Sequence, residues 1–246
     1  MSKEVIANTT GFDAFIDGHS HSTFSETIKD KSGKEVVFEQ TGTKLANVGK
    51  IIIKADGTIT HENVDLNTVE PDAEAAAYIQ TITDKFDALQ KQVVAKTSVE
   101  LTINGADGKR AVRNAETNLG DLCADAYRIL LGADIAFVNG GGVRDNIKVG
   151  DITYGDIIKV HPFGNEACLV EVTGQQIKDA LELGSAAYPG ESGGFLQVSG
   201  LTYTINADIP SSVVKNDKSE FVKVDGAYRV SDIMVGGQPL DVNKTY

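Results

Sequence analysis

One long amphipathic segment constrains the fold of this 246-residue chain more than any other feature of its sequence. From residue 71 to about residue 94, apolar residues recur at helical spacing, and the opposite face is polar. Thr68 can cap the start, and Pro71 suits a first helical turn. The stripe consists of Ala75, Tyr78, Ile79, Ile82, Phe86, Leu89 and Val93. We predict a helix that connects two regions, although a surface helix within one domain would give the same pattern.

The regions on either side of this helix carry strand signals. Before it, Lys50–Lys54 and Thr58–Val64 are predicted to form a hairpin through Asp56-Gly57. After it, strands mix with a helix over Asn118–Leu131 and a helix over 174–187 that follows the capping box Thr173-x-x-Gln176. The other predicted strands are Phe12–Asp17, Glu35–Gln40, Val48–Lys54, Val99–Ile103, Asp134–Val138, Cys168–Val172, Val198–Ile205, Phe221–Val224 and Tyr228–Val235. Because strands and helices do not alternate strictly, we expect an α+β fold.

Composition excludes some classes of function. The net charge of -12 argues against a general nucleic-acid binder, which needs a basic face, but permits a small anion held by two or three arginines. No apolar run reaches the length of a membrane span, and residues 1–10 lack the apolar core of a signal peptide. Cys123 and Cys168 show neither metal-ligand spacing nor a disulfide framework. We expect both to be buried, although the sequence does not exclude a disulfide.

The tetrapeptide Gly18-His19-Ser20-His21 directly follows an apolar run. Two imidazoles two residues apart at a strand end can reach two metal ions, or one ion and a phosphate. The same pattern fits two surface histidines, so the spacing alone leaves both interpretations open.

A glycine-rich segment, Asn139-Gly140-Gly141-Gly142-Val143-Arg144, follows the predicted buried strand at 134–138. Its glycines could adopt positive φ and present backbone N–H groups as an anion-binding nest, with the Arg144 guanidinium beside it. The alternative is a flexible turn with a surface arginine.

Two further segments carry candidate binding groups. In His161-Pro162-Phe163-Gly164-Asn165, read as a strand-exit loop, Phe163 can stack on a flat ring and Asn165 can bond a base edge, unless Phe163 is a core residue. Lys109, Arg110 and Arg113 precede the helix at Asn118. They could favour an anion at its N-terminus or form a solvated surface cluster.

The order of these segments resembles the 5'-nucleotidase family. Phe12–Phe24 is similar to the last metal-binding motif of that family's calcineurin-like metallophosphoesterase domain. The segments that resemble its C-terminal domain are Arg113–Ala126, Asn139–Arg144, Pro162–Asn165 and Gly193–Gly200. The resemblance implies three parts: residues 1–67 as the end of a β-rich metallophosphoesterase sandwich, 68–96 as a connecting helix, and 97–246 as a substrate-binding domain.

The resemblance also implies roles for individual residues. His19 and His21 would be ligands in a site for two divalent metal ions, zinc or manganese. Arg113 and Arg144, with Asn139 beside them, would hold the phosphate or ribose of the substrate. Phe163 would be one of two rings that enclose the base, and Asn165 its polar neighbour. Phe195 and the glycines of 193–200 would pack beneath the site. The implied reaction is hydrolysis of a nucleotide, a nucleotide sugar or a cyclic nucleotide, and the alternative is a non-catalytic nucleotide-binding module.

The sequence departs from the family pattern at both ends. The family's first metal motifs include an Asn-His pair, which does not occur here, and a Gly-Gly-Asp-Gly-aromatic segment with the second ring is absent after Tyr246. We therefore expect the chain alone to be inactive and to depend on an N-terminal catalytic domain that it lacks. The resemblance implies an extracellular or cell-envelope location for the parent protein, although we find no signal peptide in this chain.

Overall fold

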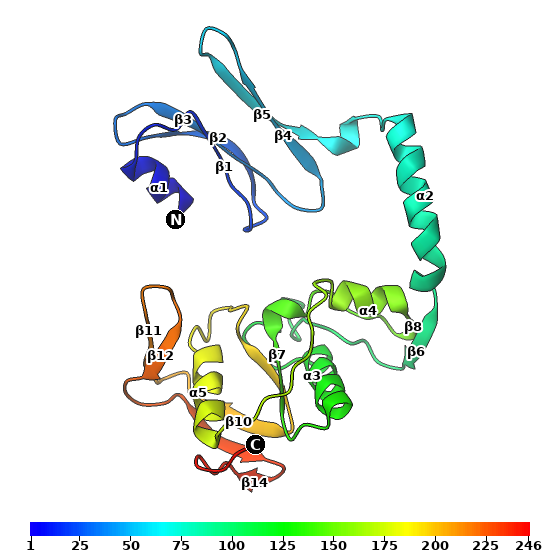
Figure 1. The fold of residues 1–246 in the computed structure, drawn as a ribbon, viewed down its shortest axis with the longest axis vertical. Coiled ribbons are helices and arrows are strands. Elements are labelled where there is room, and N and C mark those ends of the chain that lie inside the picture. The colour runs from blue at the N-terminus through cyan, green and yellow to red at the C-terminus, as the bar shows by residue number, and fades with distance from the viewer. The chain divides into compact units, whose positions relative to one another are not determined.

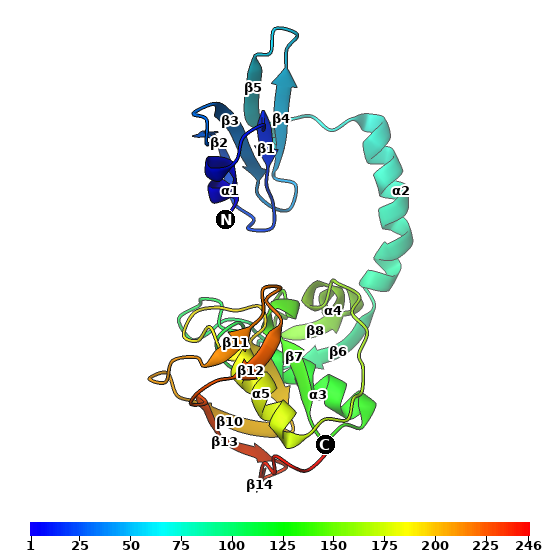
Figure 2. The same cartoon turned by 60° about the vertical axis from the view of Figure 1, so that its left-hand side comes forward.

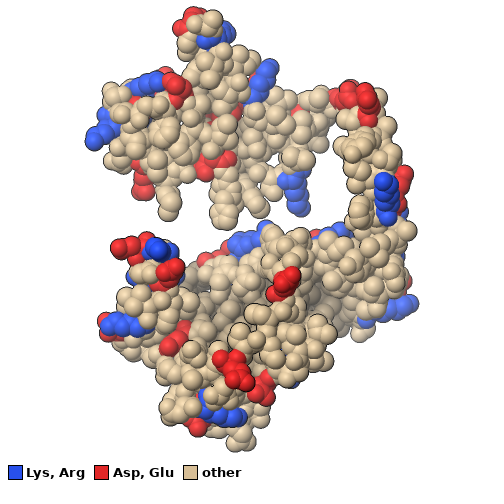
Figure 3. All heavy atoms as spheres, viewed as in Figure 1, with Lys and Arg blue, Asp and Glu red and all other residues tan.

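A computed structural model describes residues 1–246 and divides them into two compact units, Met1–Ile82 and Thr83–Tyr246. Helices and several small sheets make up both units, which confirms the α+β class (Figure 1). Each unit has its own hydrophobic core. Acidic and basic side chains are interspersed on the face shown in Figure 3.

The first unit is a small β-rich structure. Its elements are α1 (Ser2–Asn8), β1 (Ala14–Ile16), β2 (Thr23–Lys29), β3 (Glu35–Thr41), β4 (Asn47–Ile53), β5 (Ile59–Asp65) and η1 (Leu66–Thr68). The sheet order is β1-β3-β2, and β4 and β5 pair as the predicted hairpin. Helix α1 was not predicted, because its single buried side chain, Ile6, gives no periodic pattern; it packs with Val36 and Phe38.

Helix α2 (Ala73–Gln90) is shorter than predicted at both ends. Thr68 lies in η1 instead of capping α2, and the Asp72 carboxylate accepts a hydrogen bond from the Ala75 amide at 2.8 Å. The helix ends at Gln90 because Val93–Thr97 forms strand β6, which pairs with β8 (Gly150–Thr153). The predicted stripe is largely exposed, with Tyr78 and Phe86 at 68% and 54%. No helix in this structure has the length and apolar character needed to cross a membrane.

The second unit combines three helices with short, mostly antiparallel pairings (Figure 2). Helix α3 (Asn118–Leu131) confirms the prediction, and α5 (Gly174–Gly184) confirms the predicted start and capping box but ends three residues before the predicted end at 187. The remaining elements are β7 (Ala136–Asn139), η2 (Gly140–Gly142), α4 (Tyr154–Val160), β9 (Leu196–Ser199), β10 (Leu201–Ile205), β11 (Val213–Lys215), β12 (Phe221–Val224), β13 (Val230–Val235) and β14 (Gln238–Pro239).

Three strand predictions in this unit need correction. The segment 99–103 makes only an isolated bridge, at Leu101, and 168–172 forms no strand. The predicted strand 198–205 is two strands that meet at Gly200, which has a φ of 79°. In addition, the segment at 161–165 follows helix α4, not a strand.

The two cysteines differ from the expectation that both are buried. Cys123 is buried, and burial raises the pKa of its thiol to about 12. Cys168 is exposed because 168–172 does not form the buried strand predicted for it. Both cysteines are free.

Candidate ligand site

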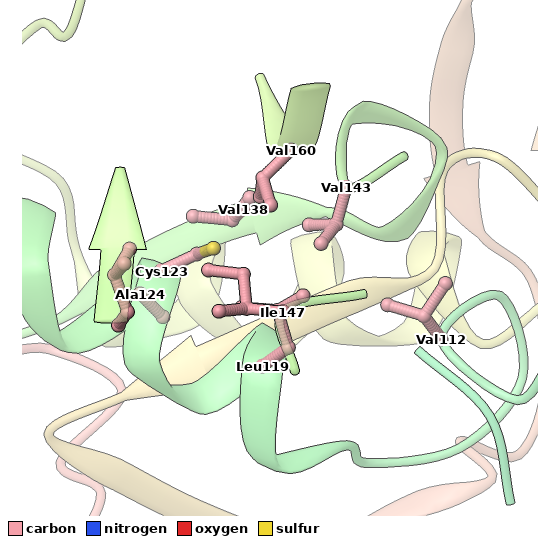
Figure 4. Packing of buried hydrophobic residues seen from close by; sticks show 9 residues of the cluster. Val112, Leu119, Cys123, Ala124, Val138, Val143, Ile147 and Val160 are labelled. Carbon is pink, nitrogen blue, oxygen red and sulfur yellow. The ribbon is translucent and has the colours of Figure 1, made fainter. Parts of the chain in front are cut away.

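A cluster of buried residues fixes the backbone around the candidate site. It includes Val112, Val138, Val143 and Val160, each of which is at most 6% exposed (Figure 4). In the sequence these valines directly precede Arg113, Asn139, Arg144 and His161. The core therefore anchors the polar residues through their neighbours, while the polar side chains remain at the surface of the second unit.

Arg113 lies in an electropositive environment. Burial lowers the pKa of its guanidinium, and the charges of Arg110 and Arg144 lower it further, with Glu191 acting in the opposite direction. Neither Arg113 nor Arg144 forms an ion pair with a carboxylate. Two guanidinium groups that form no ion pair are thus close enough for their charges to interact, which is an arrangement that favours an anion beside them.

Arg144 also contacts the aromatic side chain of Phe163. Its guanidinium carbon lies 5.6 Å from the centroid of the Phe163 ring, and its Nη1 donates to the Gly141 carbonyl at 3.3 Å. Phe163 is 59% exposed, so it is not the core residue of the alternative interpretation. Gly164, with a φ of 63°, allows the sharp turn that follows the ring. Arg144 therefore lies beside the Phe163 ring and also interacts electrostatically with Arg113.

The glycine turn does not form the predicted anion nest. Residues 140–142 adopt a 3-10 turn without positive φ. The Gly140 and Gly141 amides donate to the carbonyls of Phe195 and Gly193 at 2.7 and 2.9 Å, and the Arg144 amide donates to Val160. Glycine is needed for close approach instead, since a Cβ at Gly140 would lie 1.9 Å from the Val112 carbonyl oxygen. This contact brings the Arg113 and Arg144 segments together.

Asn139 and Asn165 line a different surface from the arginines. Both border a cavity of about 540 Å³ whose walls also include β7 and residues 166–172, and which is not lined by Arg113, Arg144 or Phe163. The Asn139 side chain donates through its Nδ2 to the Gly193 carbonyl at 3.0 Å, so this side chain is already bonded to the loop that contacts the glycine turn. The predicted site residues thus fall into two adjoining groups.

His161 belongs to the group that lines the cavity and was not among the predicted site residues. It borders the same cavity, and its ring centroid lies 5.8 Å from that of Tyr127. Burial lowers its pKa, and a hydrogen bond with the Gly142 backbone acts in the opposite direction. The hydrogen bond connects the half-buried His161 ring to the glycine turn.

A second loop secures the segment that carries Arg113. The Ser192 amide donates to the Arg113 carbonyl at 2.9 Å, and the Asn114 side chain donates to the Pro189 carbonyl at 3.0 Å. Glu191 accepts two hydrogen bonds from the Arg110 guanidinium, at 2.8 and 2.5 Å. Of the predicted basic cluster, Arg110 is thus paired, whereas Lys109 is an exposed residue 4.0 Å from Asp107. Sequence analysis missed Glu191 because its partner lies 81 residues away.

The buried side chain of Gln197 also holds the segment that carries Arg113. The sequence analysis did not predict this role. It is 1% exposed, and its amide donates to the carbonyls of Val112 and Ala115 at 3.0 and 2.7 Å. Its oxygen accepts from the Thr117 amide at 3.1 Å. A buried glutamine between apolar neighbours is the signal that could have identified it, since a buried amide must find partners.

The two candidate metal ligands lie in the first unit. His19 and His21 are both exposed and have φ values of 68° and 58°, a left-handed conformation that is uncommon for histidine. Nowhere in the chain do three or more His, Cys, Asp or Glu side chains gather in a geometry able to hold a metal ion. These residues alone do not fit a complete metal centre, which needs at least three protein ligands for a catalytic zinc.

Comparison with known proteins places this architecture in one family. Residues 93–246 match the model of the 5'-nucleotidase C-terminal domain, so the match includes every candidate residue of the second unit. The chain belongs to the 5'-nucleotidase C-terminal domain family.

Individual relatives agree with this assignment. The chain is 34% identical over 221 residues to the trifunctional nucleotide phosphoesterase protein YfkN of Bacillus subtilis, covering 82% of this chain and 14% of that protein. It is 37% identical over 138 residues to a 5'-nucleotidase of Vibrio cholerae, covering 56% of this chain and 21% of the relative. A 5'-nucleotidase precursor from Thermus thermophilus matches with a TM-score of 0.67 and 28% identity, over all of this chain and 50% of that structure. The chain therefore spans half or less of each of these proteins.

Proposed function

We propose that this chain is the substrate-binding part of a phosphoesterase that hydrolyses nucleotides with two divalent metal ions. The pair of guanidinium groups beside an exposed aromatic ring is the observation that supports this proposal most strongly. Arg113 and Arg144 lack carboxylate partners, and Phe163 is available at the same place. A nucleoside phosphate offers both complementary parts, an anion and a flat ring.

Each residue has a defined part in this proposal. Arg113 and Arg144 bind phosphate oxygens through charge-assisted hydrogen bonds. Phe163 stacks on the base with the ring face that Arg144 does not cover. Asn139 and Asn165 contact the ligand from the adjoining cavity rim. Binding energy from these groups would position the phosphate for reaction, which is how remote contacts accelerate hydrolysis.

The metal chemistry requires groups beyond those described here. His19 and His21 would contribute two imidazole ligands, with the remaining ligands from residues outside 1–246. The relatives named as nucleotide phosphoesterases and 5'-nucleotidases, of which this chain covers a fraction, support a hydrolytic parent protein. An extracellular or cell-envelope location of the parent is part of the same proposal.

The alternative is a nucleotide-binding module without catalysis. For the chain by itself this alternative is favoured because its residues form no cluster of three metal ligands. Incubation with 5'-AMP and Mn²⁺ addresses this alternative. We expect no phosphate release above buffer, and robust release that disappears in His19→Ala would show that the chain itself is catalytic.

Calorimetric titration with 5'-AMP tests the binding site. Loss of hydrogen bonds to a charged group costs about 1.5–3 kcal/mol, so Arg144→Gln should weaken binding roughly 12- to 160-fold. Lys109→Gln removes the same charge from an exposed residue and should change the affinity less than about twofold. Equal affinities of wild type and Arg144→Gln would remove Arg144 from the site.

A further inference from the structure

The Glu191 carboxylate influences the charges around Arg113 but has no role in the proposed site so far. Three arginines, Arg110, Arg113 and Arg144, are close enough for the charges of the outer two to lower the pKa of the middle one. Glu191 is the carboxylate whose charge acts in the opposite direction on Arg113. Its own pKa is lowered chiefly by the hydrogen bond from Arg110, with the charges of Arg110 and Arg113 contributing further.

Glu191 is bound to Arg110 and not to Arg113 or Arg144. The contact is bidentate, with Nε to Oε1 at 2.8 Å and Nη2 to Oε2 at 2.5 Å. This planar fork is the strongest geometry for a guanidinium–carboxylate pair. Both side chains are partly exposed, at 44% and 39%, so Arg110 could adopt other rotamers if the carboxylate were removed.

We propose that Glu191 determines which phosphate ligands the site prefers, by pairing with Arg110 and leaving the guanidinium groups of Arg113 and Arg144 without an ion pair of their own. This inference rests on the proposed function of the site. A terminal phosphate carries about -1.5 to -2 charges near pH 7, which two guanidinium groups balance. A diphosphate carries additional negative charge, for which a third free guanidinium would be needed.

The loop geometry supports a role in specificity. Glu191 lies between two residues that bond to the Arg113 segment: the Pro189 carbonyl accepts from the Asn114 side chain, and the Ser192 amide donates to the Arg113 carbonyl. The carboxylate is consequently held beside the arginines by contacts that do not depend on its own charge. Replacing Glu191 with the isosteric Gln should free Arg110 while leaving these contacts in place.

A double-mutant cycle tests the inference by comparing 5'-AMP and ADP affinities in calorimetry. Glu191→Gln should raise the ratio of ADP to AMP association constants about fivefold, the effect of one additional charge near the surface. Arg110→Gln alone leaves Glu191 unpaired and should lower this ratio. The double variant Arg110→Gln, Glu191→Gln should return it to within about twofold of wild type.

Each outcome of this cycle has one meaning. A purely structural role of Glu191 would weaken both ligands equally, and an unchanged ratio in Glu191→Gln would overturn the inference. Failure of the double variant to restore the ratio would also overturn it, because the effect would then not pass through Arg110. If wild type binds neither nucleotide, the proposed function itself fails, a result that wild type alone reveals.

Discussion

At the scale of single residues, Phe163 and Arg144 have interdependent roles. Arg144 lies over the Phe163 ring and also bonds the Gly141 carbonyl, so the ring and the charge are held in one arrangement. In the proposed site, the ring acts on the base and the guanidinium on the phosphate. The two contributions can therefore be separated by choosing ligands that offer only one of these parts.

Replacing Phe163 by Leu should weaken 5'-AMP binding and spare inorganic phosphate. Aromatic stacking contributes about 0.5–1.5 kcal/mol beyond area burial, which corresponds to roughly 2- to 12-fold in affinity. Leu keeps an apolar side chain of similar length, so the difference reports on the ring. Calorimetry with both ligands measures it, and equal losses for phosphate and 5'-AMP would assign Phe163 a supporting role only.

Asp121 on α3 should make stability depend on pH. Burial, the charge and hydrogen bond of Glu116, and the charge of Asp125 raise its pKa from 3.8 to about 6. The folded state then binds more protons than the unfolded state between these two values. This residue's contribution to stability therefore falls as the pH rises from about 4 to about 6.

Asp121→Asn should remove that dependence. We expect the variant to gain stability relative to wild type at pH 7 and to gain little at pH 4. Urea unfolding at both pH values measures the difference, and a wild-type advantage at pH 7 would contradict the assignment.

At the scale of elements, the glycine turn η2 allows the backbone at Gly140 to lie close to the Val112 carbonyl. A Cβ at Gly140 would lie 1.9 Å from the Val112 carbonyl oxygen, a distance that forces the two segments apart. Gly140→Ala should therefore destabilise the fold by several kcal/mol or displace Arg113. Thermal unfolding and 5'-AMP affinity report the two effects.

Gly105→Ala provides the matched control for this change. Its Cβ would meet the Asp107 side chain at 3.4 Å, an ordinary contact, and its φ is not in the left-handed region. We expect a change within about 0.5 kcal/mol. Similar effects of the two substitutions would show that the close approach at Gly140 has no special importance.

Elements with local signals were predictable from the sequence, whereas elements that depend on distant partners were not. Helices α3 and α5 have their own caps and apolar faces, and the β4–β5 hairpin has its Asp-Gly turn. The predicted strand at 168–172 failed because an apolar run forms a strand only when another strand pairs with it. The end of α2 was misplaced because Val93 fits the helical stripe equally well but pairs with β8.

The candidate site shows the same division. Residue type and the glycine pattern left Arg113, Arg144 and Phe163 open between a binding role and a surface or core role, and the family resemblance assigned the binding roles, which stay predictions. The anion nest was wrong because the backbone amides of Gly140 and Gly141 bond to Phe195 and Gly193, which are far away in sequence. Glu191 and Gln197 act through contacts across more than 75 residues, which no local pattern reveals.

At the scale of the whole molecule, the two units separate the candidate chemistry. Arg113, Arg144 and Phe163 lie within Thr83–Tyr246, and His19 and His21 lie within Met1–Ile82. Each unit has its own core, so the candidate site does not require the histidines for its structure. Ligand binding without metal should therefore involve the second unit alone.

Nuclear magnetic resonance titration with 5'-AMP tests this account most directly. In the metal-free, ¹⁵N-labelled chain, the account predicts saturable shifts of the Arg113 and Arg144 Nε–H signals and of the amides around Phe163, with His19 and His21 unaffected. Shifts confined to the cavity wall at 166–172, or to residues of Met1–Ile82, would contradict a shared site for the two arginines and the ring.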